Sequence, residues 1–420
     1  MAIATATIAT SRTTVVKAWR KVASDVSTGF NFTAEEVLDL IEKVPTDGTP
    51  WSAREVLNPI DLNEGYGIAS ISEGDYDSTP SAVNLEETTV DVVQFNGRFN
   101  ASKLAKYGDK GSVNQLEKQL FLMASKKVQA MNAHIADYFY GYPTAVLATT
   151  NTDVSGTTGT LTLAAGYDST ITDANFICRK FKVGDVVALV AAGSDALVDA
   201  NAIGTITAVT PATPSIAVTF IGSVSSYTTD GIRIVKANSM NQVIGGTDLN
   251  KGYVGVLAGL KTASVHSLTH TNWTTAYSNT SGGRFSSIKL RRMKDEIQNY
   301  GDGKLNMVIM DQAVYRDAVD LQLSALRFND PSVLSIDGDI DAKGVKIFTS
   351  RRALPGYAIG LDRTCMKRWM LTDKPDENVS WSDGKEYIDQ NAFVFGMDVV
   401  SAILWKNRKK TAYYSGLTTS

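Results

Sequence analysis

The chain has 420 residues, with 41 Lys and Arg, 44 Asp and Glu, three His and two Cys. At roughly 100–200 residues per domain, this length predicts two or three domains with sizeable cores. Cys178 and Cys365 are too few for a disulfide framework or for a zinc site of their own. The net charge of −3 excludes a global attraction to nucleic acid or acidic lipid. No apolar run approaches the ~20 residues of a membrane span.

Residues 1–60 read as an extended arm with short helices. Its first basic residues are Arg12, Lys17, Arg20 and Lys21, and no Asp or Glu lies between them. No basic residue precedes Arg12, so we expect no signal peptide. Thr33 and Glu36 form a capping box. The apolar spacing from Val37 to Val44 predicts a helix that Pro45 ends.

Residues 61–100 form a polar, acidic stretch that predicts a long two-stranded hairpin. Eight acids and no Lys or Arg occur between Asp61 and Gly97: Asp61, Glu64, Glu73, Asp75, Asp77, Glu86, Glu87 and Asp91. An isolated two-stranded hairpin is marginally stable in water. We therefore expect this hairpin to lie on another surface.

The clearest helical pattern covers residues 112–140. Ser112 and Gln115 fit a capping box, and Gly141 and Pro143 end the pattern. Apolar residues recur mostly three and four apart. About 28 residues at 1.5 Å each predict a helix roughly 42 Å long that packs on a core.

Residues 145–240 lose the helical pattern and alternate as short strands rich in Thr, Ser, Ala, Gly and Val. The strand-like runs are 160–163, 183–189, 203–209, 216–220 and 231–235, with a turn at Pro211–Pro214. Their spacing predicts a small inserted β-barrel. Residues 142–283 hold only seven Lys and Arg against eight Asp and Glu, so a basic groove for oligonucleotides is not expected.

Residues 241–383 return to a mixed α/β pattern. A helix is predicted over 286–300, and a buried strand over 305–310 leads into a helix capped by Asp311. Further strands are predicted at 344–348, 357–361 and 365–371. Residues 384–420 read as closing strands.

No catalytic, cofactor-binding or metal site can be assembled from the sequence. His134 borders the apolar stripe of the long helix, and His266 and His270 lack a third ligand. Asp337, Asp339 and Asp341 resemble the start of a calcium loop, but Ala342 and Phe348 occupy positions that need Gly and Glu. Phosphate-loop, nucleophile-elbow and zinc-protease motifs are absent. An enzyme is not expected.

Basic residues gather instead into clusters. One predicted helix carries Lys289, Arg291, Arg292 and Lys294. Other groups are Arg351 and Arg352; Arg363, Lys367 and Arg368; and Lys406, Arg408, Lys409 and Lys410. Basic clusters beside an acid-only hairpin indicate charge segregation, which suits self-assembly through complementary surfaces.

The order of these parts resembles the major capsid proteins of tailed bacteriophages, which have the Hong Kong 97-type fold. The resemblance rests on the hairpin 61–99, the helix 112–140, the strand and helix of 304–316, and the strand pair 344–348 and 354–361. It implies an α+β chain with an inserted all-β barrel-like domain. The implied parts are an N-terminal arm (1–60), an E-loop (61–100), a P-domain with a spine helix (101–144), the inserted barrel (145–240), an A-domain (241–383) and closing strands of the P-domain (384–420).

The resemblance further implies self-assembly into hexamers and pentamers of an icosahedral head that encloses double-stranded DNA. The E-loop would lie across a neighbouring subunit, and the helix with Lys289, Arg291, Arg292 and Lys294 is a candidate receiving surface. The basic arm would face the interior. Other expected partners are a separate scaffolding protein (only about 60 residues precede the hairpin), a portal and, as a further candidate, decoration proteins. The chain would occur in the virion after assembly in the bacterial cytoplasm.

Two alternative readings remain open. An encapsulin-like nanocompartment shares the fold, although the inserted barrel and the length count against it. A tail or adhesion protein could use the β-rich segment to bind a ligand, and it would form trimers. Some relatives crosslink their subunits through a hairpin lysine, whereas this hairpin has no Lys from Asp61 to Gly97, so a non-covalent shell is expected.

Overall fold

The computed structural model describes residues 36–44, 52, 55–63, 84–102, 113–141, 146–166, 174–192, 196–227, 230–239, 242–243, 252–270, 272–280, 282–326, 345–350, 352–371, 380–387 and 392–417. The predicted basic arm with Arg12, Lys17, Arg20 and Lys21 lies outside them. The chain divides into two compact units. The first contains Met1–Asp61, Val83–Asp137 and Met366–Lys406, and the second contains Leu62–Ala82, Tyr138–Cys365 and Asn407–Ser420.

The first unit is built on an antiparallel sheet around the long strand β18 (Ala392–Trp405). Strands β16 (Met366–Leu371), β17 (Ser380–Tyr387) and β4 (Val93–Ser102) pair with β18. Alternate β18 residues Phe395, Met397 and Val399 are buried. The residues of β18 between them point to the opposite face, because side chains alternate along a strand.

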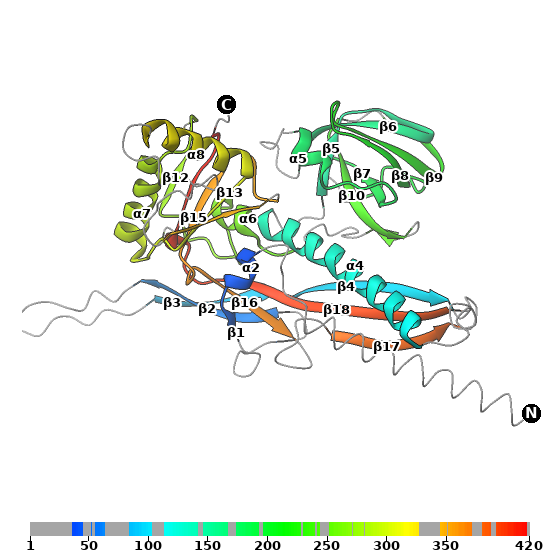
Figure 1. The fold of residues 1–420 in the computed structure, drawn as a ribbon, viewed down its shortest axis with the longest axis horizontal. Helices are drawn as coiled ribbons and strands as arrows, with labels where there is room; N and C mark the ends of the chain where they lie inside the picture. Colours follow the sequence, from blue (N-terminus) through cyan, green and yellow to red (C-terminus); the bar gives the residue numbers. More distant parts are fainter. Residues whose placement is uncertain are drawn as a thin grey trace, which may run out of the picture. The chain divides into compact units, whose positions relative to one another are not determined.

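The helix α4 (Val113–Tyr140) confirms the long helix predicted from residue 112 to 140. It runs along the sheet of β4 and β18 (Figure 1). The Met131 methyl group and the Met397 side chain both lie close to Gly97 of β4, and the ring centroids of His134 and Phe95 are 6.0 Å apart. Helix α4 thus covers the face that Met397 and Phe95 share, and its buried residues follow the predicted three- and four-residue spacing.

The hairpin consists of β2 (Glu55–Asn63) and β3 (Asn84–Asp91), which form a two-stranded sheet. It therefore begins earlier than the predicted residue 61. Residues Val93–Ser102, which we expected in the hairpin, pair with β18 instead as β4. The reason is their alternation: Val93, Phe95 and Phe99 are buried, and a strand with one apolar face requires a core to cover it.

The helix near residue 36 is shorter than predicted. Helix α2 spans Glu36–Leu40, whereas Lys43–Val44 form strand β1, which runs parallel to β16. The prediction that the helix extends to Val44 is wrong. Val44 pairs with Trp369, so tertiary pairing overrides the helical spacing of these apolar residues.

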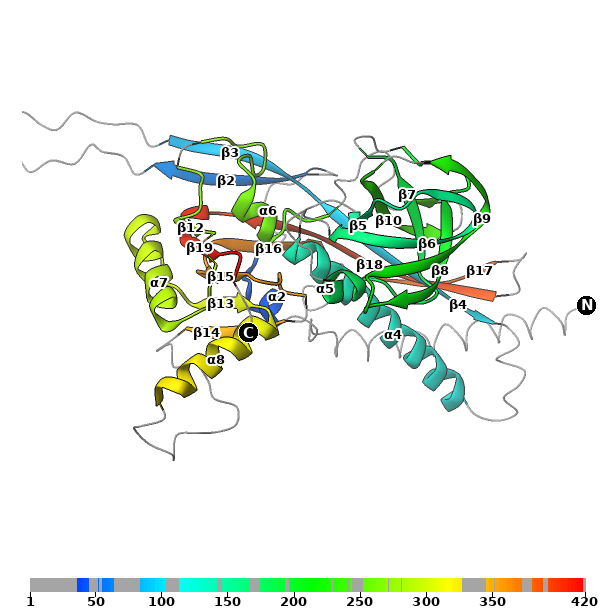
Figure 2. The same cartoon turned by 90° about the horizontal axis from the view of Figure 1, so that it is seen from above.

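The inserted segment of the second unit contains seven strands: β5 (Val146–Thr150), β6 (Val154–Gly166), β7 (Val186–Val190), β8 (Ile203–Thr210), β9 (Ser215–Tyr227), β10 (Ile232–Ser239) and β11 (Gln242–Val243). Each strand-like run predicted here overlaps one of them, but β7 begins at Val186 and not at residue 183. Strand β10 pairs with both β5 and β7, so six strands form a closed ring of hydrogen-bonded pairs. The short helix α5 (Ala174–Cys178) accompanies them (Figure 2). Their core is aliphatic and aromatic.

A second sheet of this unit has the strand order β12 (Tyr277–Asn279), β19 (Thr411–Tyr414), β15 (Ala358–Leu361), β13 (Met307–Met310) and β14 (Lys346–Thr349). Helices α7 (Ser287–Gly301) and α8 (Gln312–Leu326) contribute Met293, Ile297, Val314 and Ala318 to the same core. The helix α6 spans Val256–Lys261, and a 3-10 helix, η2, spans Arg408–Lys410.

The strand pairing differs from the division expected at residues 383 and 384. Strand β16, which we expected with the preceding α/β segment, pairs with β18 and buries Trp369 against Ala402. Strand β19, expected among the closing strands of the other part, pairs with β12 and β15. Local patterns predict that a strand exists, but not which sheet it joins, because pairing partners lie far apart in the sequence.

Candidate interaction surfaces

Helix α7 carries the predicted basic cluster. The Ser286 side chain accepts a hydrogen bond from the backbone N–H of Lys289 at the start of the helix. Leu290, Met293 and Ile297 are buried at a spacing of three and four, which places Arg291 and Lys294 on exposed parts of the helix.

The other two basic residues of α7 contact their own domain. Lys289 donates to the carbonyl oxygens of Gly282 and Gly283 at 3.4 and 3.3 Å and lies 5.4 Å above the Tyr414 ring. Burial lowers the pKa of Lys289. Arg292 lies 4.8 Å above the Tyr277 ring and forms an ion pair with Glu296 at 3.6 Å. Arg291, Arg292 and Lys294 are therefore exposed, while Lys289 is half-buried, and Lys289 and Arg292 also contact groups of their own fold.

Residues 406–410 do not form a surface cluster as a whole, because Arg408 is buried. Its side chain is buried, with Nε donating to the Gly259 carbonyl at 2.7 Å, Nη1 to the Trp273 carbonyl at 2.7 Å and Nη2 to the Thr262 carbonyl at 2.8 Å. Two of these carbonyls lie at the C-terminal end of α6, where helical partners are missing. Burial lowers the pKa of Arg408 to about 10. Arg368, from another predicted cluster, is also buried.

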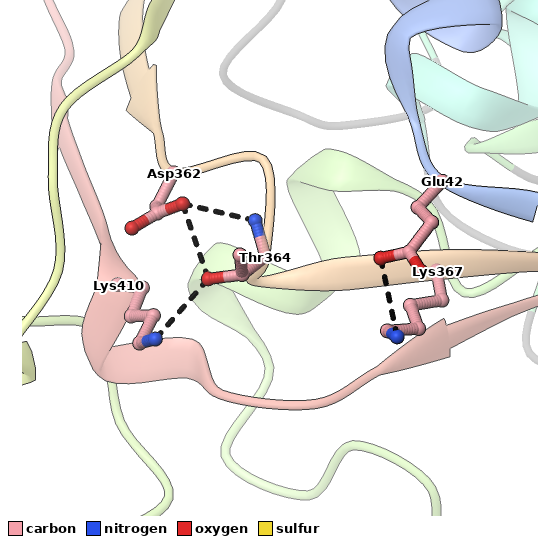
Figure 3. A network of polar contacts seen from close by, with 5 residues as sticks. All are labelled: Glu42, Asp362, Thr364, Lys367 and Lys410. Carbon is pink, nitrogen blue, oxygen red and sulfur yellow. Dashed lines mark hydrogen bonds and ion pairs between the residues drawn. The ribbon is translucent and has the colours of Figure 1, made fainter.

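Asp362 organises a turn after β15 (Figure 3). Its Oδ2 accepts from the Lys304 backbone at 2.7 Å, and its Oδ1 accepts from the Asn306 amide at 3.2 Å and the Thr364 backbone at 2.9 Å. Lys410 Nζ donates to Thr364 Oγ1 at 3.1 Å. Burial raises the pKa of the adjacent Cys365 thiol. The arrangement joins three segments of chain and keeps the thiol protonated, so it has the properties of a structural junction.

The first unit contains a separate ion pair at β1 and β16. Lys367 Nζ lies 3.1 Å from the Glu42 carboxylate. Figure 3 draws this ion pair as a dashed line. Both side chains are partly exposed, and such pairs contribute little to stability.

The base of the hairpin is held to its own chain. Val56 and Val90 pack with Trp369, Ala402 and Leu404. Buried Asn58 donates from Nδ2 to the Trp405 carbonyl at 2.9 Å, and Thr88 Oγ1 donates to the Asn58 carbonyl at 3.0 Å. Asn58 could not be identified from the sequence, because a lone Asn before Pro59 predicts a turn as readily as a buried contact.

The structure describes few of the predicted hairpin acids. Glu86 is half-buried and Glu87 is exposed on β3, and Asp61 lies on β2. Glu64, Glu73, Asp75 and Asp77 lie outside the described residues.

No metal centre is evident in the described part of the chain, where no group of three His, Cys, Asp or Glu side chains is arranged to hold an ion. His134 is half-buried beside Phe95. His266 lies in a turn with φ of 55°, and His270 Nδ1 accepts from the Asn272 backbone at 3.1 Å. The predicted acidic turn at Asp337, Asp339 and Asp341 lies outside the described ranges. Among the helices that are described, none combines the length and the hydropathy of a membrane span.

Comparisons with known proteins found no matching family model and no matching curated protein. Solved structures from phages align with most of this chain at low sequence identity. The cyanophage A-1(L) capsid asymmetric unit has 7% identity and a TM-score of 0.49, covering 91% of this chain and 92% of that chain. A chain of Gordonia phage Cozz has 10% identity and a TM-score of 0.46, covering 91% and 86%. The satellite phage P4 procapsid with its size determination protein has 10% identity and a TM-score of 0.43, covering 93% and 89%. At these identities and scores no residue role is carried over to this chain.

Proposed function

We propose that this chain is the major capsid protein of a tailed bacteriophage and that many copies form an icosahedral head around packaged double-stranded DNA. The observation that carries the proposal is the hairpin β2–β3. Its base packs on the sheet of its own chain, while its two strands form a sheet of only two strands among the described residues. The long helix α4 on the β4–β18 sheet and the separate α/β sheet with α7 and α8 accompany it in the predicted order.

A two-stranded ribbon explains why other copies are needed. Within the described residues β2 and β3 pair only with each other, so beyond the packed base the ribbon has unpaired edges, and an isolated two-stranded ribbon is marginal in water. Burial of the ribbon on a neighbouring subunit would remove this instability. Weak contacts suffice in a shell, because each subunit is held by several neighbours and linked contacts raise the effective concentration of one another.

The proposed partners are other copies of this chain, a separate scaffolding protein, a portal, decoration proteins and non-specifically bound double-stranded DNA. The basic arm would face the shell interior. We place the protein in the virion after assembly in the bacterial cytoplasm and assign it a structural, non-enzymatic role.

Electron microscopy of the purified full-length protein tests the proposal. We expect closed shells of uniform diameter, formed with or without a co-expressed scaffolding protein. Discrete trimers would indicate the tail or adhesion alternative, and shells whose content in infected cells is protein cargo without DNA would indicate a nanocompartment. Either result would overturn the capsid assignment.

Denaturing gels of the shells test the non-covalent character of the contacts. The hairpin has no lysine between Asp61 and Gly97, so we expect a single band at the 45.2 kDa chain mass. A ladder of higher species under reducing conditions would contradict this expectation.

A further inference from the structure

The closed ring of strands in the inserted segment has two different ends. Each of its six strand pairs is antiparallel, so successive connections along the chain lie at opposite ends of the ring. The connections β5–β6, β7–β8 and β9–β10 lie at one end, which we call the distal end. The connections β6–β7 and β8–β9 lie at the other, the proximal end, where the chain also enters β5 and leaves β10.

The proximal end is basic. Four of its described residues are cations: Arg179, Lys180, Lys182 and Lys236. Arg179 and Lys182 are exposed, on the connection between α5 and β7. Asp185 is the one acid among the described residues of this end, and its Oδ2 accepts a hydrogen bond from the Lys182 backbone N–H at 3.1 Å. We call residues 179–183 the basic turn.

An exposed apolar side chain completes the basic turn. Val183 is 67% exposed and follows Lys182 directly. The turn is fixed to the barrel, because Phe181 is buried in the core and the Gly184 backbone N–H donates to the Ile206 carbonyl at 2.8 Å. An apolar contact with a polar rim is the usual anatomy of a protein interface, so the basic turn suits a protein partner.

The distal end is acidic. Three of its described residues are acids: Asp153, Asp199 and Asp230. Asp153 and Asp230 are exposed on two connections that are joined, because Asn151 Oδ1 accepts a hydrogen bond from the Gly231 backbone N–H at 2.9 Å. Arg233, which is half-buried on β10, is the one cation among the described residues of this end.

Apolar surface lies among the acids of the distal end. Leu197 and Tyr227 pack on the barrel core but are only half-buried. Leu197 bridges to Val190 at the end of β7, and Tyr227 pairs with Val154, the residue after Asp153. The distal end therefore has apolar groups with carboxylates beside them, which is the complement of the basic turn.

One barrel cannot bring its own two ends together. Strand β7, from Val186 to Val190, runs between them and is about 13 Å long, and the ring around it has a filled core. Each end must therefore find its partner on another molecule. Opposite charges on two surfaces of one chain fit two copies of that chain, because they attract each other and repel the wrong pairing.

We propose that the basic turn of one copy binds the distal end of the barrel of a second copy. The cations of the turn lie beside Asp153 and Asp230, and Val183 packs on Leu197 and Tyr227. The two surfaces differ, so the contact is heterologous, and repetition around an axis closes a ring. This inference rests on the proposed self-assembly and assigns the inserted segment a role in it, which is to join neighbours within one ring of the shell.

A charge swap in the full-length chain tests the contact. Arg179→Glu with Lys182→Glu, and separately Asp153→Lys with Asp230→Lys, should each lower the yield of shells about tenfold, because like charges then face each other. Combining both pairs in one chain should restore the yield to within about twofold of the unaltered chain. Sedimentation and electron microscopy measure the yield.

The matched control places new carboxylates on the barrel wall. Thr158→Glu with Thr160→Glu changes two exposed residues of β6 away from both ends, and it should leave the shell yield within about twofold of normal. Thermal melts of the unassembled variants show whether each pair of changes leaves the fold intact.

Two results of the swap overturn the inference, namely normal yields from either reversed pair and no restoration when the pairs are combined. Restoration of Arg179→Glu with Lys182→Glu by Glu73→Lys, Asp75→Lys and Asp77→Lys would assign the basic turn to the hairpin of a second copy. Normal shells that package less DNA would assign it to nucleic acid. Either of these results also overturns the inference.

The swap separates this inference from the proposed function. If the unaltered chain forms no shells, the proposed function fails, but rings that the same reversals dissociate would support the barrel contact. If the chain forms neither shells nor rings, both fail.

Crosslinking remains informative if a reversed variant does not fold. A water-soluble carbodiimide joins a lysine amine to a carboxylate in contact with it as an amide, and the reagent takes up the water as a urea. In assemblies of the unaltered chain we expect links from Lys180 or Lys182 to Asp153 or Asp230. Mixed isotope-labelled subunits should show that these links join different chains. Links from these lysines only to other carboxylates would overturn the inference.

Discussion

The segment η2 and the helix α7 have the same basic character in the sequence but opposite uses in the structure. Arg408 of η2 is buried and donates to three backbone carbonyls, whereas Arg291 and Lys294 of α7 are exposed. A basic cluster can therefore serve the fold or the surface. What distinguishes them is whether nearby carbonyls lack partners, as they do at the end of α6.

Among the changes that test this difference, Arg408→Met should have the largest effect on stability. The methionine fills similar space but leaves the carbonyls of Gly259, Thr262 and Trp273 without their donors. We expect the free energy of unfolding to fall by about 3–5 kcal/mol, measured by urea denaturation of the unassembled chain. The control Arg363→Met, at an exposed position, should change it by at most about 0.5 kcal/mol. Equal effects would contradict the structural role of Arg408.

Asn58→Ala extends the contrast to the hairpin. The change removes a buried donor and leaves the Trp405 carbonyl without it, which we expect to cost about 1–3 kcal/mol. Hydrogen exchange should become faster in β2 and β3 in particular. Asn96→Ala is the matched control, because Asn96 bonds Asp398 on an exposed face. If both variants exchange alike, the hairpin base is not held through Asn58.

Arg291→Glu with Lys294→Glu tests the exposed side of the contrast. Both side chains are exposed, so we expect the free energy of unfolding to change by at most about 0.5 kcal/mol in each position. Arg292→Glu should cost more, because it removes the contact with the Tyr277 ring and the ion pair with Glu296. Thermal melts of the double variant and of Arg292→Glu provide the measurement, and equal melting temperatures would show that Arg292 is as dispensable as its neighbours.

Ser267→Gly should have the opposite sign, a gain in stability. His266 and Ser267 have φ of 55° and 59° in a turn that brings Val265 and Leu268 together. Glycine adopts this left-handed conformation without the steric cost of a Cβ, so we expect a gain of about 1 kcal/mol in urea denaturation. Ser267→Ala should give no such gain, and a gain of the same size from it would refute the backbone explanation.

The sequence by itself determined most elements and few of their neighbours. The spacing of apolar residues identified α4, and alternation identified the strands that form the closed ring of the inserted segment. The acid-only hairpin and the absence of catalytic motifs are also properties of the sequence alone. These features are local, because helix and strand periodicity repeat within a few residues.

Only the tertiary structure decided which strands meet and which charges remain exposed. Strand β16 pairs with β18 and strand β19 pairs with β15, the reverse of the expected division, since pairing depends on residues far along the chain. Arg408 and Arg291 look alike in sequence, but only Arg408 meets carbonyls that lack helical partners. Met123 of α4 likewise fits the apolar spacing of the sequence together with Leu120 and Val128, but its side chain is exposed. A helix can bury only the side that faces its sheet, so Phe121, Leu122 and Met123 stay exposed in a single chain.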